Sequence, residues 1–535
     1  MSASVERTLA VLCGVLVCLH FSLAFRPQDA LPSEPLNDDS FYALTIADNI
    51  ARGDGMSIDG HLETNGFQPL IVLIYALVFR LSGGDLFLQI RLVHLVNAFL
   101  AMLSAALLYR FCARMMSSMN SGRVISLFAV LLWLGTVPTF IYKMNGLDTG
   151  LYFAAILACL LCYQNLRRCP RASVRRVIAF GALLGLTVLT RIDAVFLVAT
   201  FCIMHIWHHR WKFHRAVRDA AIMGATAIGV SSPWWIYNIA LFGSPMPTSG
   251  YAQGLHSGTL NCSVCGNLAA LLPALNTLLY PFTYLPNRAF LSRYFPGGTL
   301  WYSLAVTVLV TAATLVLTVK RDRTRRVLQS ILYADLMPLY GFGVLLFIFY
   351  TFFFCTSHFI NRYLSPVLVA TVPVNAVIIT RVLSLLRIGR TRLAVVGIPV
   401  IGAMLTAGLF LFVTYRFADA NNPFYTDQWR WVAENISDKH ARIGAGQTGT
   451  LGYFRRSAVN LDGKVNFEAL RALRSGTIGR YVMEKDIEYL IDWPKYLEMN
   501  ILRYPEIEET FVEIDRRGDF GVFRRRELIG GEGGG

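Results

Sequence analysis

The sequence predicts an α-helical polytopic membrane protein with about eleven transmembrane helices, juxtamembrane helices and a small C-terminal α/β domain. The composition, the length of the apolar runs and the placement of the basic residues predict it. Hydrophobic types make up 55% of the 535 residues and charged types 16%, and the mean hydropathy is +0.48. Soluble proteins carry about a quarter charged residues. A soluble domain of this size could not bury so much apolar surface, so the bilayer is its expected solvent.

Apolar runs long enough to cross the roughly 30 Å hydrocarbon layer recur along the chain. They lie at residues 8–25, 86–109, 124–142, 147–163, 177–190, 192–207, 219–240, 300–319, 335–355, 363–381 and 393–416. Two of them, 177–190 and 192–207, are nearly fused and predict a helical hairpin with Arg191 and Asp193 at its tip. A cleaved signal peptide is the alternative for the first run, but the many later spans favour an uncleaved helix.

The basic residues orient these spans. The net charge of +15 is compatible with nucleic-acid binding, but Lys and Arg occur in short blocks between apolar runs, as in cytoplasmic loops. We therefore expect no nucleic-acid partner. The blocks are Arg110/Arg114/Arg123, Arg167–Arg176, His208–Arg218, Lys320–Arg326 and Arg387–Arg392. If each is cytoplasmic, the protein lies in the cytoplasmic (inner) membrane and its outward-facing parts are 26–85, 143–148, 191–193, 241–299, 356–362 and the tail after 416.

A shorter apolar run, 67–82, is bounded by Pro69 and by Gly83-Gly84. Counting this run as a span would invert every later loop. We therefore expect a juxtamembrane helix in the outer interface, within the first outer loop 26–85. The alternative is a true span combined with one wrong assignment later in the chain.

The composition changes at residue 417, which predicts two domains, 1–416 in the membrane and 417–535 outside the cytoplasm. The tail alternates polar helical patterns with short strand-like runs, as in a small α/β domain. The helical patterns lie at Gln428–Asn435, Phe467–Arg474 and Gly479–Asp486, and the strand-like runs at Arg442–Gly446, Glu488–Ile491, Thr510–Ile514 and Gly521–Phe523. In the outer loop 241–299, Cys262 and Cys265 form a CxxC pair. The pair predicts either a disulfide or two free thiols, and a lone CxxC is too weak to indicate zinc.

Candidate catalytic acids cluster at the outer ends of the helices. Asp38 and Asp39 open an amphipathic helix directly after the first span. The simpler interpretation is that they cap the helix, yet two adjacent acids exceed what a cap needs. Asp148 begins a helix that enters the bilayer at once, and it too is either a cap or a site. A transporter would place its charges near the midplane, where this sequence has almost none.

Basic side chains lie at the same depth. The second outer loop carries Lys143 and Asn145, the hairpin tip carries Arg191 beside Asp193, and the turn before the tenth span carries His358 and Arg362. For the tip, an internal Arg–Asp ion pair is the structural alternative to a binding role.

Together these residues resemble the GT-C superfamily of membrane glycosyltransferases. The resemblance is closest to its arabinofuranosyltransferase-like and protein mannosyltransferase/aminoarabinose-transferase-like branches, and it covers the whole membrane region. It rests on short segments in family order: Asp38–Tyr42, Thr64–Leu70, Asn145–Gly150, the Arg191/Asp193 tip and Asn361–Tyr363. In the tail, Asn460–Asn466 is similar to a segment of uncharacterised relatives.

The resemblance implies an inverting enzyme whose donor is a sugar on a polyprenyl phosphate. Asp38 matches the leading catalytic acid of the family's acidic pair, Asp39 the second acid, and Asp148 an acid that follows the third span. Tyr42, Asn65, Gln68, Asn145, Asp193 and His358 are further site candidates.

The chemistry of inversion fits these residue types. One carboxylate takes the acceptor proton, and the leaving phosphate requires Lys or Arg, for which Lys143, Arg191 and Arg362 are candidates. Asp38, Asp39 and Asp148 could instead hold Mg²⁺ or Mn²⁺. The aromatic runs Phe347–Phe354 and Trp234-Trp235 line a groove for the polyprenyl chain or simply face membrane lipids.

The sequence therefore predicts a glycosyltransferase, hexosyl or pentosyl, that transfers a sugar to a cell-envelope glycan, lipid or protein acceptor on the outer face of the membrane. A membrane transporter or lipid flippase is the first alternative, and a non-catalytic scaffold is the second.

Overall fold

The computed structural model describes residues 3–117, 119, 121–168, 173–259, 335–354, 359–385, 387–388, 391–418, 423–518 and 520–528, with short pieces between 270 and 308. Cys262, Cys265, His358 and nearly all of the expected span 300–319 lie outside the described residues. Predictions that concern them therefore stay predictions.

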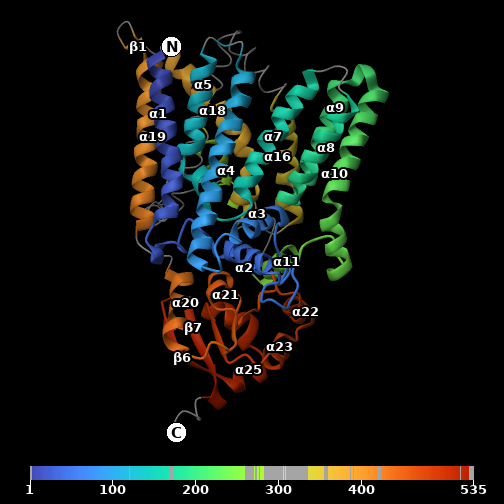
Figure 1. The fold of residues 1–535 in the computed structure, drawn as a ribbon, viewed down its shortest axis with the longest axis vertical. Helices are drawn as coiled ribbons and strands as arrows, with labels where there is room; N and C mark the ends of the chain where they lie inside the picture. The colour runs from blue at the N-terminus through green and yellow to red at the C-terminus, as the bar shows by residue number, and fades with distance from the viewer. Residues whose placement is uncertain are drawn as a thin grey trace.

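The membrane part is a bundle of long helices, with the N-terminus at the end opposite the C-terminal domain (Figure 1). Every other expected span is helical. The helices are α1 (Ala3–Ser22), α4 (Leu86–Met115), α5 (Gly122–Gly135), α6 (Val137–Met144), α7 (Thr149–Arg168), α8 (Val174–Thr190), α9 (Ala194–His208), α10 (Phe213–Phe242), α16 (Met337–Ile348), α18 (Leu368–Leu385) and α19 (Leu393–Ala418).

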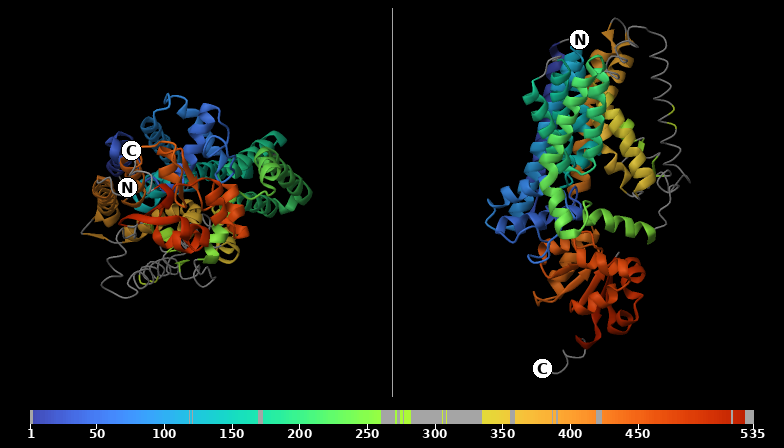
Figure 2. Two further views of the ribbon diagram at one scale, coloured as in Figure 1. Left: turned by 90° about the horizontal axis from the view of Figure 1, so that it is seen from below. Right: turned by 90° about the vertical axis from the view of Figure 1, so that its right-hand side faces the viewer.

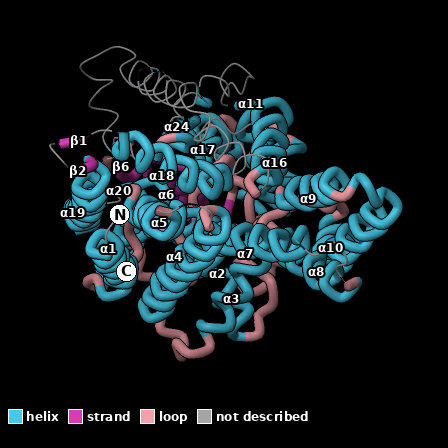
Figure 3. Tube along the Cα trace, turned by 90° about the horizontal axis from the view of Figure 1, so that it is seen from above, coloured by secondary structure: helices cyan, strands magenta, loops and turns pink. Residues whose placement is uncertain are grey.

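Within the described part of the chain, five helices are long and apolar enough to cross a membrane alone, and six spans result if α5 and α6 count as one. These two helices are bent by 63° at a break. The break follows Gly135, and Pro138 disfavours continued helix just before it. The shorter helices α8 and α9 stand beside α10 at one side of the bundle (Figure 3). The fold class expected from the sequence is confirmed, although the number of spans is not fixed by helix length alone.

The connections alternate between the two ends of the bundle as the charge pattern predicts. The helix ends that carry the basic blocks lie at the end that holds the N-terminus, as does the hairpin of β1 (Arg387–Ile388) and β2 (Thr391–Arg392) (Figures 1 and 2). The block Lys320–Arg326 is outside the described residues. The first outer loop and the C-terminal domain lie at the other end.

Two helices of the first outer loop, α2 (Asp38–Arg52) and α3 (Pro69–Phe79), pack beneath the bundle (Figure 1). Helix α3 has 11 residues and is therefore only about 16 Å long, about half the hydrocarbon thickness. It is too short to cross on its own, and its placement in the outer interface stays a prediction. Phe41 of α2 and Tyr75 of α3 share a buried core with Val93 of α4.

The C-terminal domain contains a five-stranded sheet of order β4-β3-β5-β7-β6. Strands β3, β4 and β5 are parallel, and β7 runs antiparallel to β5 and β6. The strands are β3 (Ile443–Ala445), β4 (Ala458–Asn460), β5 (Tyr489–Asp492), β6 (Phe511–Arg517) and β7 (Phe520–Arg525), and the main helices are α20 (Pro423–Asn435), α21 (Gly449–Phe454), α22 (Phe467–Ser475), α23 (Ile478–Glu484) and α25 (Pro505–Thr510).

Both faces of this sheet are covered. Successive residues of β5 point to opposite sides, so Ile491 packs with Trp431 of α20 while Leu490 packs with Ile478 of α23. The sequence predicted four of the strands. It did not predict β4 or α21, which have three and six residues.

Candidate active site

A cavity of about 400 Å³ lies where the bundle, the first outer loop and the C-terminal domain meet. Helix α11 (Thr248–Thr259) runs along the same end of the molecule (Figure 2). One part of the wall is apolar and aromatic, and the other carries most of the sequence-predicted polar residues. The polar lining residues include Asp39, Tyr42, Gln68, Asp148, Arg191, Asp193, Arg362 and Lys464.

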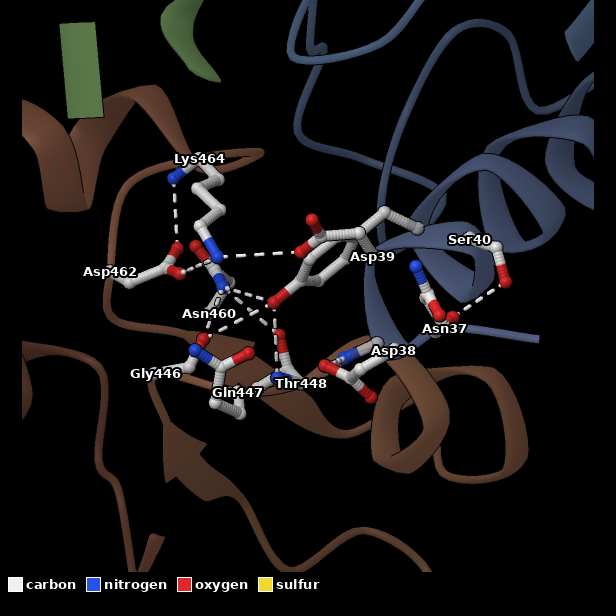
Figure 4. Close-up of polar contacts among 12 residues, drawn as sticks. Asn37, Asp38, Asp39, Ser40, Gly446, Gln447, Thr448, Asn460, Asp462 and Lys464 are labelled. Carbon is white, nitrogen blue, oxygen red and sulfur yellow. Dashed lines mark hydrogen bonds and ion pairs between the residues drawn. The ribbon is translucent and has the colours of Figure 1, made fainter. Parts of the chain in front are cut away.

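Asp39 lies between two cations from distant parts of the chain. Its Oδ2 is 3.4 Å from Arg362 Nη1, and its Oδ1 is 3.4 Å from Lys464 Nζ. Figure 4 shows Asp39 and Lys464 facing each other across the junction of α2 and the C-terminal domain. Burial alone would raise the pKa of Asp39, but Lys464 and Arg362 outweigh it and hold the pKa below its usual value. Asp39 is therefore an ionised carboxylate at the cavity wall at neutral pH.

A second cluster of charged residues lies where the outer ends of α7, α8 and α9 meet. Arg191 Nη2 is 2.7 Å from Asp193 Oδ2, and Arg191 Nε is 3.5 Å from Asp148 Oδ2. The hydroxyls of Tyr152 and Tyr350 donate to Asp193 at 3.0 and 2.8 Å. The ion pair expected as the structural alternative for the hairpin tip is thus present. Of the two acids, Asp148 makes the longer contact with Arg191. Burial raises the pKa of Asp148, although the positive charges of Arg191 and Arg362 act to lower it.

Asp38 faces the C-terminal domain and does not line the cavity. Its two carboxylate oxygens accept hydrogen bonds from Gly449 N at 3.1 Å and from Thr450 N and Oγ1 at 2.7 and 2.9 Å. Only 5% of Asp38 is exposed. Burial raises its pKa to about 6, against the opposing hydrogen bonds from Thr450 and Gly449. The arrangement gives Asp38 an interdomain contact, whereas the sequence had predicted the leading catalytic acid here.

Three further predicted residues lie in or beside the site, and two of them make hydrogen bonds that connect its segments. The Tyr42 hydroxyl donates to Gly446 O and accepts from Thr448 N, both at 3.2 Å. Asn65 Oδ1 accepts from Thr248 N at 3.0 Å. Gln68 lines the cavity with a buried Oε1 that has no hydrogen-bond partner among the described residues. It is free to accept a hydrogen bond from a ligand.

Two predicted site residues lie elsewhere. Lys143 is fully buried, donates to Trp133 O at 2.5 Å and lies over the Trp133 ring. The bend between α5 and α6 turns this side chain back onto α5 and away from the cavity lining. Asn145 uses its Oδ1 to accept from Leu147 N at 3.0 Å, and its carbonyl accepts from Asn37 N. The geometry gives no support to phosphate binding by Lys143 and assigns Asn145 to the turn.

Sequence reasoning missed Lys464, although it lies in the Asn460–Asn466 segment, which was noted without a role. It also left Tyr363 and Phe359 unassigned, yet both line the cavity and lie under the Arg362 guanidinium, whose carbon is 5.3 and 4.9 Å from the ring centroids. The sequence feature that could have pointed to Lys464 is the Asp462-Gly463-Lys464 segment, in which an acid and a base flank a glycine in a loop after a strand.

The predicted divalent cation does not fit these acids as they are arranged. No three His, Cys, Asp or Glu side chains of the described residues are placed to share a metal ion. Asp38 is engaged by Gly449 and Thr450, Asp39 has two cations as neighbours, and Asp148 is paired with Arg191. Asp38 also does not line the cavity that Asp39 and Asp148 share.

The fold and the cavity define a polytopic membrane protein whose polar site lies at one membrane surface, between a helical bundle and an α/β domain. At the level of sequence, the chain matches no family profile and no curated protein.

Solved structures do share its architecture. The chain is similar to ArnT from Cupriavidus metallidurans bound to undecaprenyl phosphate, with a TM-score of 0.58 and 12% identity over 96% of this chain and 97% of ArnT. The apo state of the same protein gives a TM-score of 0.56. The chain therefore has the fold of ArnT over nearly its full length, and this is the type of fold that its motifs predicted.

Proposed function

We propose that this protein is an inverting glycosyltransferase that uses a sugar linked to a polyprenyl phosphate. It would transfer that sugar to a cell-envelope glycan, lipid or protein on the outer face of the cytoplasmic membrane. The observation that carries the proposal is the position of Asp39, an ionised carboxylate between Arg362 and Lys464 on the wall of the cavity. The ArnT structure, which has undecaprenyl phosphate bound, supports the choice of donor.

In the proposed reaction, transfer of the acceptor's proton to Asp39 is coupled to the negative charge that develops on the leaving phosphate. As the acceptor oxygen bonds to the anomeric carbon, its proton passes to Asp39, and the carbon–oxygen bond to the lipid phosphate breaks. The phosphate keeps the electron pair and gains one negative charge. Protonated Asp39 no longer competes for Arg362 and Lys464, so both cations become available to the phosphate.

Asp148 is the second carboxylate of the cavity. Because Arg191 is held mainly by Asp193, Asp148 retains capacity to accept a hydrogen bond from an acceptor hydroxyl. We assign it to orienting the acceptor. The aromatic wall formed by Phe349, Tyr350 and Phe354 offers an apolar surface for the first isoprene units of the donor.

The test is a turnover assay with full-length protein in nanodiscs and a panel of pentosyl and hexosyl polyprenyl phosphates, with release of polyprenyl phosphate as the readout. Asp39→Asn should lower turnover by about 10²- to 10⁴-fold, the usual loss for a general base. Asp148→Asn should lower it less. The matched control is Asp427→Asn, an exposed aspartate of the C-terminal domain, which should leave turnover unchanged.

Movement of intact lipid-linked sugar across the bilayer without cleavage would instead indicate a flippase. Near-normal turnover of Asp39→Asn would place the base elsewhere.

A further inference from the structure

Lys464 is the only charged residue that the C-terminal domain contributes to the described cavity lining. It follows β4 in the loop that ends at Asn466, and its side chain reaches Asp39 of α2 across the domain junction (Figure 4). The cavity is therefore completed by a residue that lies 425 positions after Asp39 in the chain.

The charge balance of the cavity depends on this lysine. The described lining carries three cations, Arg191, Arg362 and Lys464, and three anions, Asp39, Asp148 and Asp193. Without Lys464 the lining would have a net charge of −1, which would repel a phosphate in a partly desolvated site.

The ammonium of Lys464 also retains capacity to bind. Its carboxylate contacts, to Asp39 at 3.4 Å and to Asp462 at 3.3 Å, are longer than the 2.7–2.9 Å typical of charge-assisted hydrogen bonds. An ammonium has three donors, so an incoming phosphate oxygen can take a shorter bond without removing both neighbours. Lys464 is half-buried, but the negative charges of Asp39 and Asp462 outweigh the desolvation and raise its pKa, so the charge is retained.

The backbone of Lys464 is held from both domains. Its N–H donates to Asp462 Oδ1 at 2.9 Å, and its carbonyl accepts from Thr248 Oγ1 at 2.9 Å. Gly66 packs directly against the same carbonyl, and a Cβ at this position would collide with it. The Thr64–Leu70 segment and the Asn460–Asn466 segment thus fix Lys464 at the cavity.

We propose that Lys464 binds the phosphate group of the lipid-linked substrate, so that the docked C-terminal domain supplies part of the donor site. This inference rests on the proposed function and deepens it, because it names a substrate-binding residue outside the membrane domain. The ligand chemistry is a phosphate group, carried either by a polyprenyl lipid or by free phosphate.

Binding to the full-length protein in nanodiscs tests the proposal, with undecaprenyl phosphate and undecaprenol as probes. Lys464→Gln should weaken undecaprenyl phosphate binding by about tenfold or more, the effect of losing one hydrogen bond to a charged group. Undecaprenol binding should not change. Lys464→Arg should restore most of the affinity. The matched control is Lys495→Gln, an exposed lysine of the same domain, which should bind both lipids normally.

Normal undecaprenyl phosphate binding by Lys464→Gln would overturn the inference and leave the proposed function standing. Equal weakening of both lipids would also overturn it, since the lysine would then act only on the fold. If the wild type does not distinguish undecaprenyl phosphate from undecaprenol, the proposed function itself fails. Competition by inorganic phosphate separates the two sources: displacement of the lipid assigns the subsite to phosphate alone, and no displacement assigns it to lipid-borne phosphate.

Discussion

Adjacent side chains, Asp38 and Asp39, enter different environments because successive residues of a helix point about 100° apart. Asp38 turns toward Gly449 and Thr450, where it accepts three hydrogen bonds but loses contact with water. Asp39 turns toward Arg362 and Lys464. Two adjacent aspartates therefore have opposite pKa shifts: the pKa of Asp38 is raised and the pKa of Asp39 is lowered.

The raised pKa of Asp38 predicts a pH dependence of stability. Burial raises this pKa to about 6, and an unfolded aspartate titrates near 3.9. The native state therefore binds the proton more tightly, and its contribution is fully present below about pH 3.9 and is lost as the pH rises through about 6. We expect the advantage of the wild type over Asp38→Asn in unfolding free energy to shrink by up to about 3 kcal/mol across that window. Melting curves of both proteins over this range measure it, and an advantage that grows with pH would contradict it.

Lys143 and Lys464 also differ in whether their side chains reach the cavity. Lys143 is near Asp148 in sequence but lies against Trp133, whereas Lys464 is distant in sequence but lines the cavity. Lys143→Met, which keeps an unbranched side chain one atom shorter and removes the charge, should leave undecaprenyl phosphate affinity unchanged. A phosphate-binding role for Lys143 would instead cost about tenfold, and titration of the lipid into the purified variant distinguishes the two results.

At the scale of elements, helix α21 joins the two domains through its first turn. Gly449 packs against the backbone of Asp38, and a Cβ there would collide with the Asp38 carbonyl. Gly452, in the same helix, has open space around its Cα. The two glycines form a matched pair for testing whether α21 docks the C-terminal domain.

Gly449→Ala should destabilise the docking by about 1–3 kcal/mol because the interface is overpacked. Gly452→Ala should be neutral or stabilising by about 0.5–1 kcal/mol, as alanine favours the helix. Limited proteolysis of the purified variants, with release of the C-terminal domain as the readout, reports the docking. Equal cleavage of the two variants would show that α21 does not hold the domains together.

At the scale of the whole molecule, the described basic helix ends lie at one end of the bundle, and the first outer loop and the C-terminal domain lie at the other (Figure 1). Both of these parts contribute residues to the cavity lining. By the positive-inside rule we expect the basic side to be cytoplasmic. In a background without the native cysteines, Gly60→Cys and Leu255→Cys should react with an impermeant thiol reagent added to intact cells, and Ala172→Cys should not. Reaction of Ala172→Cys before the cells are permeabilised would invert the orientation.

The sequence by itself determined the membrane class, the alternation of the described helices between the two ends of the bundle and most of the polar residues at one of those ends. These features depend on local hydropathy and charge, which are read along the chain. The tertiary structure decided which acid faces the cavity, because that choice depends on the rotation of α2 against the C-terminal domain. It also decided that Lys464 joins Asp39 and that Lys143 does not. Contacts between residues hundreds of positions apart leave no periodic signal in a single sequence, so only the packed fold reveals them.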